Sequence, residues 1–184
     1  TGFGRMGTPF ATQEFGVKPD IITMAKAITN GAIPMGGVAV TDDIYDTVVN
    51  SAPGNGIEFF HGYTYSAHPA ACAAGIATQK IYESDGLFEN AANLESYFLD
   101  AVFSLRDHPL VADIRGIGMM AGVEVHPEGA PGARGGEMQK AMFWNGLHVK
   151  WTGDNAIIAP AFVAERKHID EIVDKFRKTL DDMM

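Results

Sequence analysis

The spacing of apolar residues changes near residue 84, and this change divides the chain into two parts. In the first part, short apolar runs such as "DIITMA" (20–25) and "GGVAV" (36–40) have the length of strands and are bounded by Gly, Pro and Asn. Continuous apolar runs of this kind are typical of strands buried in an α/β sheet. We expect loops between and after these strands, followed by a helix over 66–84 with Pro69 in its first turn.

After residue 84 the apolar residues have helical spacing. Positions three and four residues apart between Leu87 and Leu105 predict an amphipathic helix. The following pattern predicts a strand at 118–125, a loop at 126–136, a short helix at 137–145, strands at 147–151 and 155–160, and a helix from about residue 165. This order indicates a compact α+β unit, so the predicted domains are residues 1–84 and 85–184.

Composition and charge narrow the class of protein. The chain has 184 residues, 46% of them hydrophobic, which is enough to bury a sizeable core. Its formal net charge of -9 repels phosphate backbones and anionic membrane surfaces, so we expect no nucleic-acid or membrane partner. The apolar run at 156–164 is too short to span a bilayer. The single Cys72 cannot form an internal disulfide, and a cytoplasmic location fits best.

Lys26 is the first candidate for chemistry. It directly follows the apolar run at 20–25, where burial would remove solvent from its amine. Desolvation favours the neutral amine, which is the form that condenses with an aldehyde to give a Schiff base. From these residues alone, a solvated lysine at the end of a strand remains the alternative interpretation.

The segment before the predicted helix at 66–84 carries further candidates. Thr64 has a small hydroxyl close to a helix start, where it could bind an anion, or it could be an ordinary turn residue. Tyr63 could shape a pocket or simply pack. His61 and His68 are too far apart for one helical face and have no Cys or carboxylate cluster nearby, so we predict no metal site.

Four stretches in register closely resemble the class III aminotransferases, which use pyridoxal 5'-phosphate (PLP). They are "TGFGR" (1–5), "KPDIITMAKAITNGAIPMGGV" (18–38), "HGYTYSAHPAACAAG" (61–75) and "DIRGIGMMAGVEV" (113–125). Within the family, the resemblance is strongest to the ω-amino acid:pyruvate (β-alanine:pyruvate) group. It implies an α/β chain of fold type I, in which 1–84 form the C-terminal part of the PLP-binding large domain. Residues 85–184 would then form a linking helix and a small α+β domain.

The resemblance also implies roles for single residues. Lys26 matches the lysine that forms the Schiff base with PLP and then moves the proton during transamination. Thr64, with Tyr63 beside it, matches the threonine that binds the PLP phosphate of the neighbouring subunit. Lys150 stands where many relatives have an arginine that holds the substrate carboxylate, and a lysine lacks the bidentate fork of arginine. Lys150 and its neighbour Trp151 are therefore the expected substrate-binding residues. A solvated strand residue is the other reading of Lys150.

Arg115, within the stretch at 113–125, also resembles a family position. For this residue we expect a structural salt bridge with a nearby carboxylate.

The activity implied by the resemblance is transfer of an amino group from an ω-amino acid or amine to a keto acid such as pyruvate, by a homodimer with shared active sites. Alternatives are a semialdehyde aminomutase, an ornithine or diaminobutyrate aminotransferase, or a non-catalytic scaffold fragment. In the family, an aspartate that pairs with the pyridine nitrogen lies just before "TGFGR". Because the sequence begins after that position, we expect a truncated chain whose 184 residues alone do not catalyse transamination.

Overall fold

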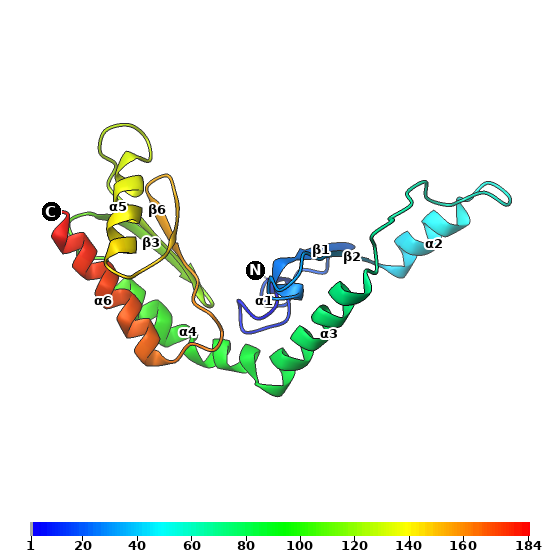
Figure 1. The fold of residues 1–184 in the computed structure, drawn as a ribbon, viewed down its shortest axis with the longest axis horizontal. Helices are drawn as coiled ribbons and strands as arrows, with labels where there is room; N and C mark the ends of the chain where they lie inside the picture. Colours follow the sequence, from blue (N-terminus) through cyan, green and yellow to red (C-terminus); the bar gives the residue numbers. More distant parts are fainter. Residues whose placement is uncertain (1) are drawn as a thin grey trace. The chain divides into compact units, whose positions relative to one another are not determined.

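The computed structural model describes residues 2–184 and divides them into two compact units (Figure 1). The C-terminal unit comprises Phe3–Pro9 and Leu87–Met184, and the N-terminal unit comprises Gly2 and Phe10–Gly86. Thr1, the first residue of the "TGFGR" stretch, lies outside the described residues. The sequence pattern gave no sign that residues 3–9 belong with the C-terminal half. The assignment of the two parts of the chain to a large and a small domain stays a prediction.

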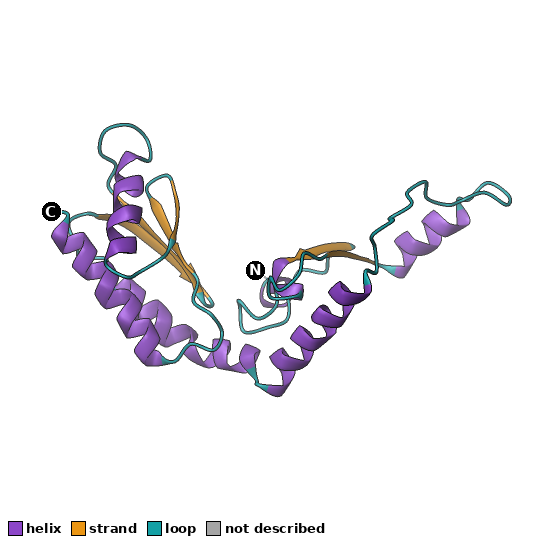
Figure 2. Ribbon diagram, viewed as in Figure 1, coloured by secondary structure: helices purple, strands orange, loops and turns teal. Residues whose placement is uncertain are grey.

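The C-terminal unit is built on a four-stranded antiparallel sheet. Its strand order is β3 (Val111–Ile117), β4 (Met120–Val125), β6 (Asn155–Ile158) and β5 (Lys150–Thr152). Three helices accompany the sheet, and Figure 2 shows them together beside the strands: α4 (Leu87–Phe103), α5 (Ala133–Trp144) and α6 (Arg166–Asp182). This unit is therefore a two-layer arrangement of helices on a sheet.

Among the described residues, the helices pack on one face of this sheet and none packs on the other (Figure 1). Ile114, Val123 and Ala156 lie in register across three strands, and all three are buried in one cluster with residues of α4, α5 and α6. The largest fully buried side chains of that cluster include Phe98 and Phe176. Because side chains alternate along a strand, the next row of residues points to the opposite face.

Two helices of the C-terminal unit confirm their predictions closely. The helix predicted between Leu87 and Leu105 is α4, and the helix predicted from about residue 165 is α6. The structure also corrects the sequence analysis, since α5 begins at Ala133, inside the predicted loop, and strand β3 was not predicted from the apolar pattern.

The N-terminal unit contains little buried surface. Its strands β1 (Ile21–Ala25) and β2 (Gly36–Val40) form a two-stranded antiparallel sheet, accompanied by α1 (Ala11–Glu14), η1 (Lys26–Ile28), α2 (Asp42–Asn50) and α3 (Pro69–Ser84). No residue of either strand is fully buried, so the prediction of buried strands is wrong for the described chain. The prediction of loops after β2 is also wrong, because Asp42–Asn50 is helical.

Candidate functional site

Lys26 lies where strand β1 ends and η1 begins. Its backbone φ is 56°, in the left-handed region that residues other than glycine rarely occupy. The turn is closed by the Lys26 carbonyl, which accepts the N–H groups of Thr29 at 3.2 Å and Gly31 at 3.1 Å. The side chain is exposed, so the expected desolvation of the amine is not found in residues 2–184. The reason is that the two-stranded sheet gives the end of β1 no cover.

Helix α3 holds the backbone that follows Lys26. The Tyr82 hydroxyl donates to the Ala27 carbonyl at 2.8 Å, and the Gln79 amide donates to the Ile28 carbonyl at 3.2 Å. Thr29 is fully buried, and its hydroxyl donates to the Ile33 carbonyl at 2.7 Å. The lysine therefore presents an exposed amine from a turn that three side chains fix.

Thr64 and Tyr63 line an open hollow of about 470 Å³ beside the first turn of α3. The hollow is also lined by His61, His68 and Cys72. The His61 ring accepts the Tyr63 backbone N–H at 3.0 Å, and the two ring centroids are 3.9 Å apart. A hydroxyl and a helix start on one hollow are suited to an anion, because the first N–H groups of a helix lack partners within the helix.

The two histidines of this hollow and Lys26 do not form one compact site. Among the described residues, no group of three His, Cys, Asp or Glu side chains could hold a metal ion. Lys26 does not line the hollow. The structure thus places Thr64 and Tyr63 together, with Lys26 apart from them in the same unit.

Lys150 and Trp151 are neighbours in β5 but lie on opposite faces of the sheet. Trp151 pairs with buried Ala156 and stacks on Phe176, with ring centroids 6.3 Å apart and an interplanar angle of 21°. Lys150 pairs with Ile157 on the face without helices and is exposed. The two side chains therefore cannot contact one substrate from the same side of the sheet. A substrate role for either stays a prediction.

Arg115 confirms the expected structural salt bridge. Its guanidinium lies 2.7 Å from the Asp113 carboxylate and 3.0 Å from that of Glu124. The hydrogen bond that Arg115 donates to the Glu124 carboxylate is the main cause that raises the pKa of Arg115 above its ordinary value.

Sequence reasoning missed two residues that hold the elements around Lys150. Arg5 donates to the carbonyls of Met119 and Pro160, and Asp154 accepts N–H groups at the start of α5. The partners of both residues are distant in the sequence, so no local spacing could have indicated them.

Within residues 2–184, no helix is long and apolar enough to cross a membrane.

Comparison with known proteins identifies the family of this chain. It belongs to the class-III aminotransferase family, whose model matches residues 1–180. The chain is 50% identical over 181 residues to the omega-aminotransferase of Caulobacter vibrioides, covering 98% of this chain and 41% of that protein. It is 39% identical over 183 residues to the beta-alanine–pyruvate aminotransferase of Pseudomonas aeruginosa, again covering 98% and 41%.

Solved structures agree with these relatives. An (S)-enantioselective omega-transaminase from Thermomicrobium roseum superposes with a TM-score of 0.91 at 37% identity, covering 100% of this chain and 42% of that one. A transaminase solved with L-Ala has a TM-score of 0.95 at 29% identity, covering 99% and 44%. The chain therefore spans about two fifths of the length of the relatives that it matches.

Proposed function

We propose that this chain carries the cofactor-binding lysine of a PLP-dependent aminotransferase, which moves an amino group from an ω-amino acid or amine to a keto acid such as pyruvate. The family match over residues 1–180 supports the reaction class. The names of the relatives, which include omega-aminotransferase and beta-alanine–pyruvate aminotransferase, support the substrate class. The observation that carries the proposal is Lys26 on a fixed turn within the matched stretch at 18–38.

The residues around Lys26 fit a role in holding PLP. Its amine is exposed, and in the part of the chain that the structure describes Lys26 takes part in none of the ion pairs. An aldehyde can therefore reach the amine without breaking a salt bridge. PLP, when bound, supplies the electron sink that allows the substrate Cα–H bond to ionise. We propose that Lys26 Nζ is the base that accepts this proton from the substrate Cα and then donates it to C4' of PLP.

Thr64 is the proposed ligand of the PLP phosphate in a neighbouring subunit. The hollow that Thr64 lines does not include Lys26, which supports a site shared between two copies of the chain. A homodimer with composite active sites is accordingly part of the proposal. A cytoplasmic location is also proposed, because the single Cys72 cannot form an internal disulfide.

Lys150 is the proposed contact for the substrate carboxylate. It is exposed on the face of the sheet that carries no helices, so a small acid can approach it. A lysine provides the charge as a point without a planar fork, and we expect weaker and less directional binding than an arginine gives. The chain matches only about two fifths of the length of its relatives. We therefore also propose that these 184 residues alone do not catalyse transamination.

The test is retention of PLP by the complete protein, with Lys26→Ala compared with Lys80→Ala. Lys80 is an exposed lysine of α3 in the same unit and serves as the matched control. After borohydride reduction, mass spectrometry should find PLP attached to Lys26, with retention and activity lost only in Lys26→Ala. Unmodified Lys26 in the protein without substitutions would refute the proposal.

An amine panel with pyruvate or 2-oxoglutarate as acceptor then separates the alternatives. Amino transfer to pyruvate supports the ω-amino acid group, and a preference for 2-oxoglutarate indicates an ornithine-type or diaminobutyrate-type enzyme. Isomerisation of a semialdehyde without an acceptor indicates an aminomutase. Absence of all three activities, with PLP still bound, indicates a scaffold.

A further inference from the structure

The turn between β5 and β6 is bound to the start of helix α5 by one carboxylate. Asp154 Oδ2 accepts the Gly132 N–H at 3.0 Å, and Asp154 Oδ1 accepts the Gly135 N–H at 2.9 Å. Gly132 is the N-cap of α5, and no side chain within the cap itself makes a capping hydrogen bond. Asp154 therefore supplies the cap from a distant part of the chain, where the helix dipole also favours a negative charge.

Glycine at 135 allows this contact to be close. A Cβ at residue 135 would overlap the Gly153 carbonyl oxygen and lie 2.9 Å from the Gly153 carbonyl carbon. A Cβ at residue 132 would lie 3.3 Å from Gly153 Cα. The backbone of the turn thus rests directly on the backbone of the first turn of α5, and both carboxylate oxygens of Asp154 fasten it there.

Strand β5 has little strand pairing of its own. It is an edge strand of only three residues, Lys150–Thr152, and its only strand partner within residues 2–184 is β6. Thr152 pairs with Asn155 across the turn that contains Asp154, and Lys150 pairs with Ile157 two residues further along the hairpin. A short edge strand whose turn is released opens readily, because few hydrogen bonds hold it.

We propose that Asp154 is a positioning residue for Lys150, which it serves by clamping the β5–β6 hairpin to α5. This inference rests on the proposed function, because it concerns the site where Lys150 would meet a substrate carboxylate. Asp154 itself uses both carboxylate oxygens on backbone N–H groups and does not contact the substrate. Releasing the clamp spreads the Lys150 amine over many positions, which weakens binding of the carboxylate and leaves the chemistry at Lys26 unchanged.

The test compares Asp154→Ala and Asp154→Asn with Asp174→Ala in the complete protein loaded with PLP. Asp174 is an exposed aspartate of α6 in the same unit and serves as the matched control. For Asp154→Ala we expect the KM for pyruvate to rise about tenfold, below the roughly 100-fold that a 1 Å displacement of a positioned group can cost. The kcat should stay within about twofold, and the half-reaction with a simple alkyl amine that has no carboxylate should not change. Asp154→Asn keeps one acceptor oxygen, so its KM should lie between that of Asp154→Ala and that of the control Asp174→Ala.

Hydrogen exchange provides a readout that does not depend on activity. Amides of residues 150–158 should exchange faster in Asp154→Ala, while those of α4 and α6 keep their protection and so report that the unit remains folded. An unchanged KM, an equal loss with the alkyl amine and with pyruvate, or unchanged exchange at 150–158 would each overturn the clamp. A protein without substitutions that transfers no amino group refutes the proposed function, and the exchange data then still decide whether Asp154 holds the hairpin.

Discussion

Arg5→Ala should destabilise the C-terminal unit by loosening the attachment of its residues 3–9 to its residues 87–184. The Arg5 guanidinium donates to the Pro160 carbonyl at 2.7 Å and to the Met119 carbonyl at 2.9 Å. It also lies 4.4 Å from the centre of the Phe162 ring. The backbone carbonyl of Arg5 accepts the Met119 N–H at 2.9 Å, and this bond does not depend on the Arg5 side chain.

The magnitude follows from these contacts. Each hydrogen bond from a charged donor contributes about 1.5 to 3 kcal/mol, and the contact with the aromatic ring adds about 0.5 to 1 kcal/mol. Because Arg5 is half-buried, water can replace part of what the carbonyls lose. The contacts together would contribute about 3.5 to 7 kcal/mol, and we expect the free energy of unfolding to fall by only about 2 to 4 kcal/mol because of this replacement by water.

Urea unfolding followed by tryptophan fluorescence measures this effect selectively. Both tryptophans of these 184 residues, Trp144 and Trp151, lie in the C-terminal unit, so the fluorescence of this chain reports on that unit. Arg106→Ala is the matched control, because its guanidinium lies 4.7 Å from the centre of the Phe103 ring. The control should lose no more than about 1 kcal/mol. A loss in Arg5→Ala no larger than that in Arg106→Ala would show that residues 3–9 are not fastened by Arg5.

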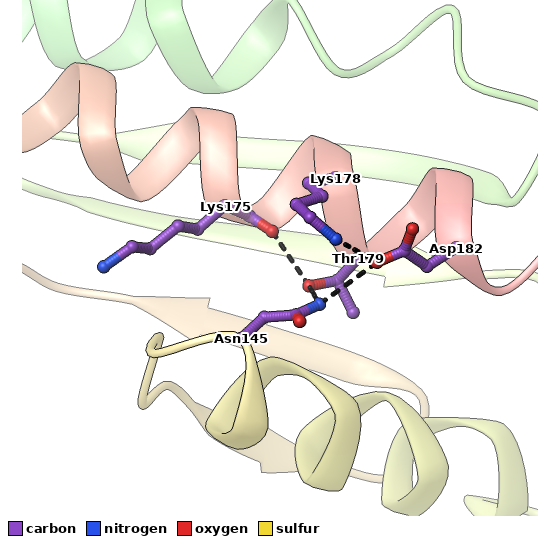
Figure 3. A network of polar contacts seen from close by, with 5 residues as sticks. All are labelled: Asn145, Lys175, Lys178, Thr179 and Asp182. Atoms are coloured by element: carbon purple, nitrogen blue, oxygen red, sulfur yellow. Dashed lines mark hydrogen bonds and ion pairs between the residues drawn. The ribbon is translucent and has the colours of Figure 1, made fainter.

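Two further predictions concern helix α6. The fully buried Thr179 hydroxyl accepts a hydrogen bond from the Asn145 side-chain amide at 3.0 Å (Figure 3). Thr179→Val should therefore lower the free energy of unfolding by about 1 to 2 kcal/mol in the same urea assay. An unchanged urea midpoint would refute this. The hydrogen bond from Lys175 lowers the pKa of Glu171, so its stabilising effect is present above the unfolded pKa of Glu171 and is lost as the pH falls through the folded value. Glu171→Gln should therefore flatten the acid side of a plot of melting temperature against pH, and an identical acid side in both proteins would contradict it.

The helices of the C-terminal unit were predictable because their apolar residues keep the helical period. The predicted apolar positions Leu94 and Phe98 are both buried in α4. Strand β3 was missed because its residues do not form an apolar run. Asp113 and Arg115 point to the face without helices, and the pairing shifts register between Val111 and Asp113, which interrupts simple alternation.

The N-terminal unit shows the limit of reading burial from apolar content. Val38 and Ile21 have exposed fractions of 64% and 53%, although their runs look like those of buried strands. Burial depends on what packs on a strand, and the strand's own sequence does not contain that information. Helix α2 was predictable in principle, since Asp42 and Asp43 form an acidic first turn after Thr41 at the N-cap.

The candidate site was predictable in part. The stretch at 18–38 identified Lys26 and its place at a strand end, but the exposure of its amine depends on long-range packing. Lys150 and its neighbour Trp151 were both predicted to bind the substrate, because Lys150 matches the position of the family arginine. The two-residue period of a strand was enough to separate them, and the pairing of Trp151 with buried Ala156 decides which residue faces the core.

The hairpin that carries Lys150 is fixed at three places, and this matters more for a lysine than for an arginine. Asp154 holds its turn, Trp151 stacks on Phe176 in its first strand, and Arg5 binds the Pro160 carbonyl just beyond its second strand. A flexible four-carbon stem with a single ammonium has no fork to orient a carboxylate, so the position of the backbone must supply the precision. A rigid hairpin is thus the feature that would let a lysine serve as the proposed carboxylate contact.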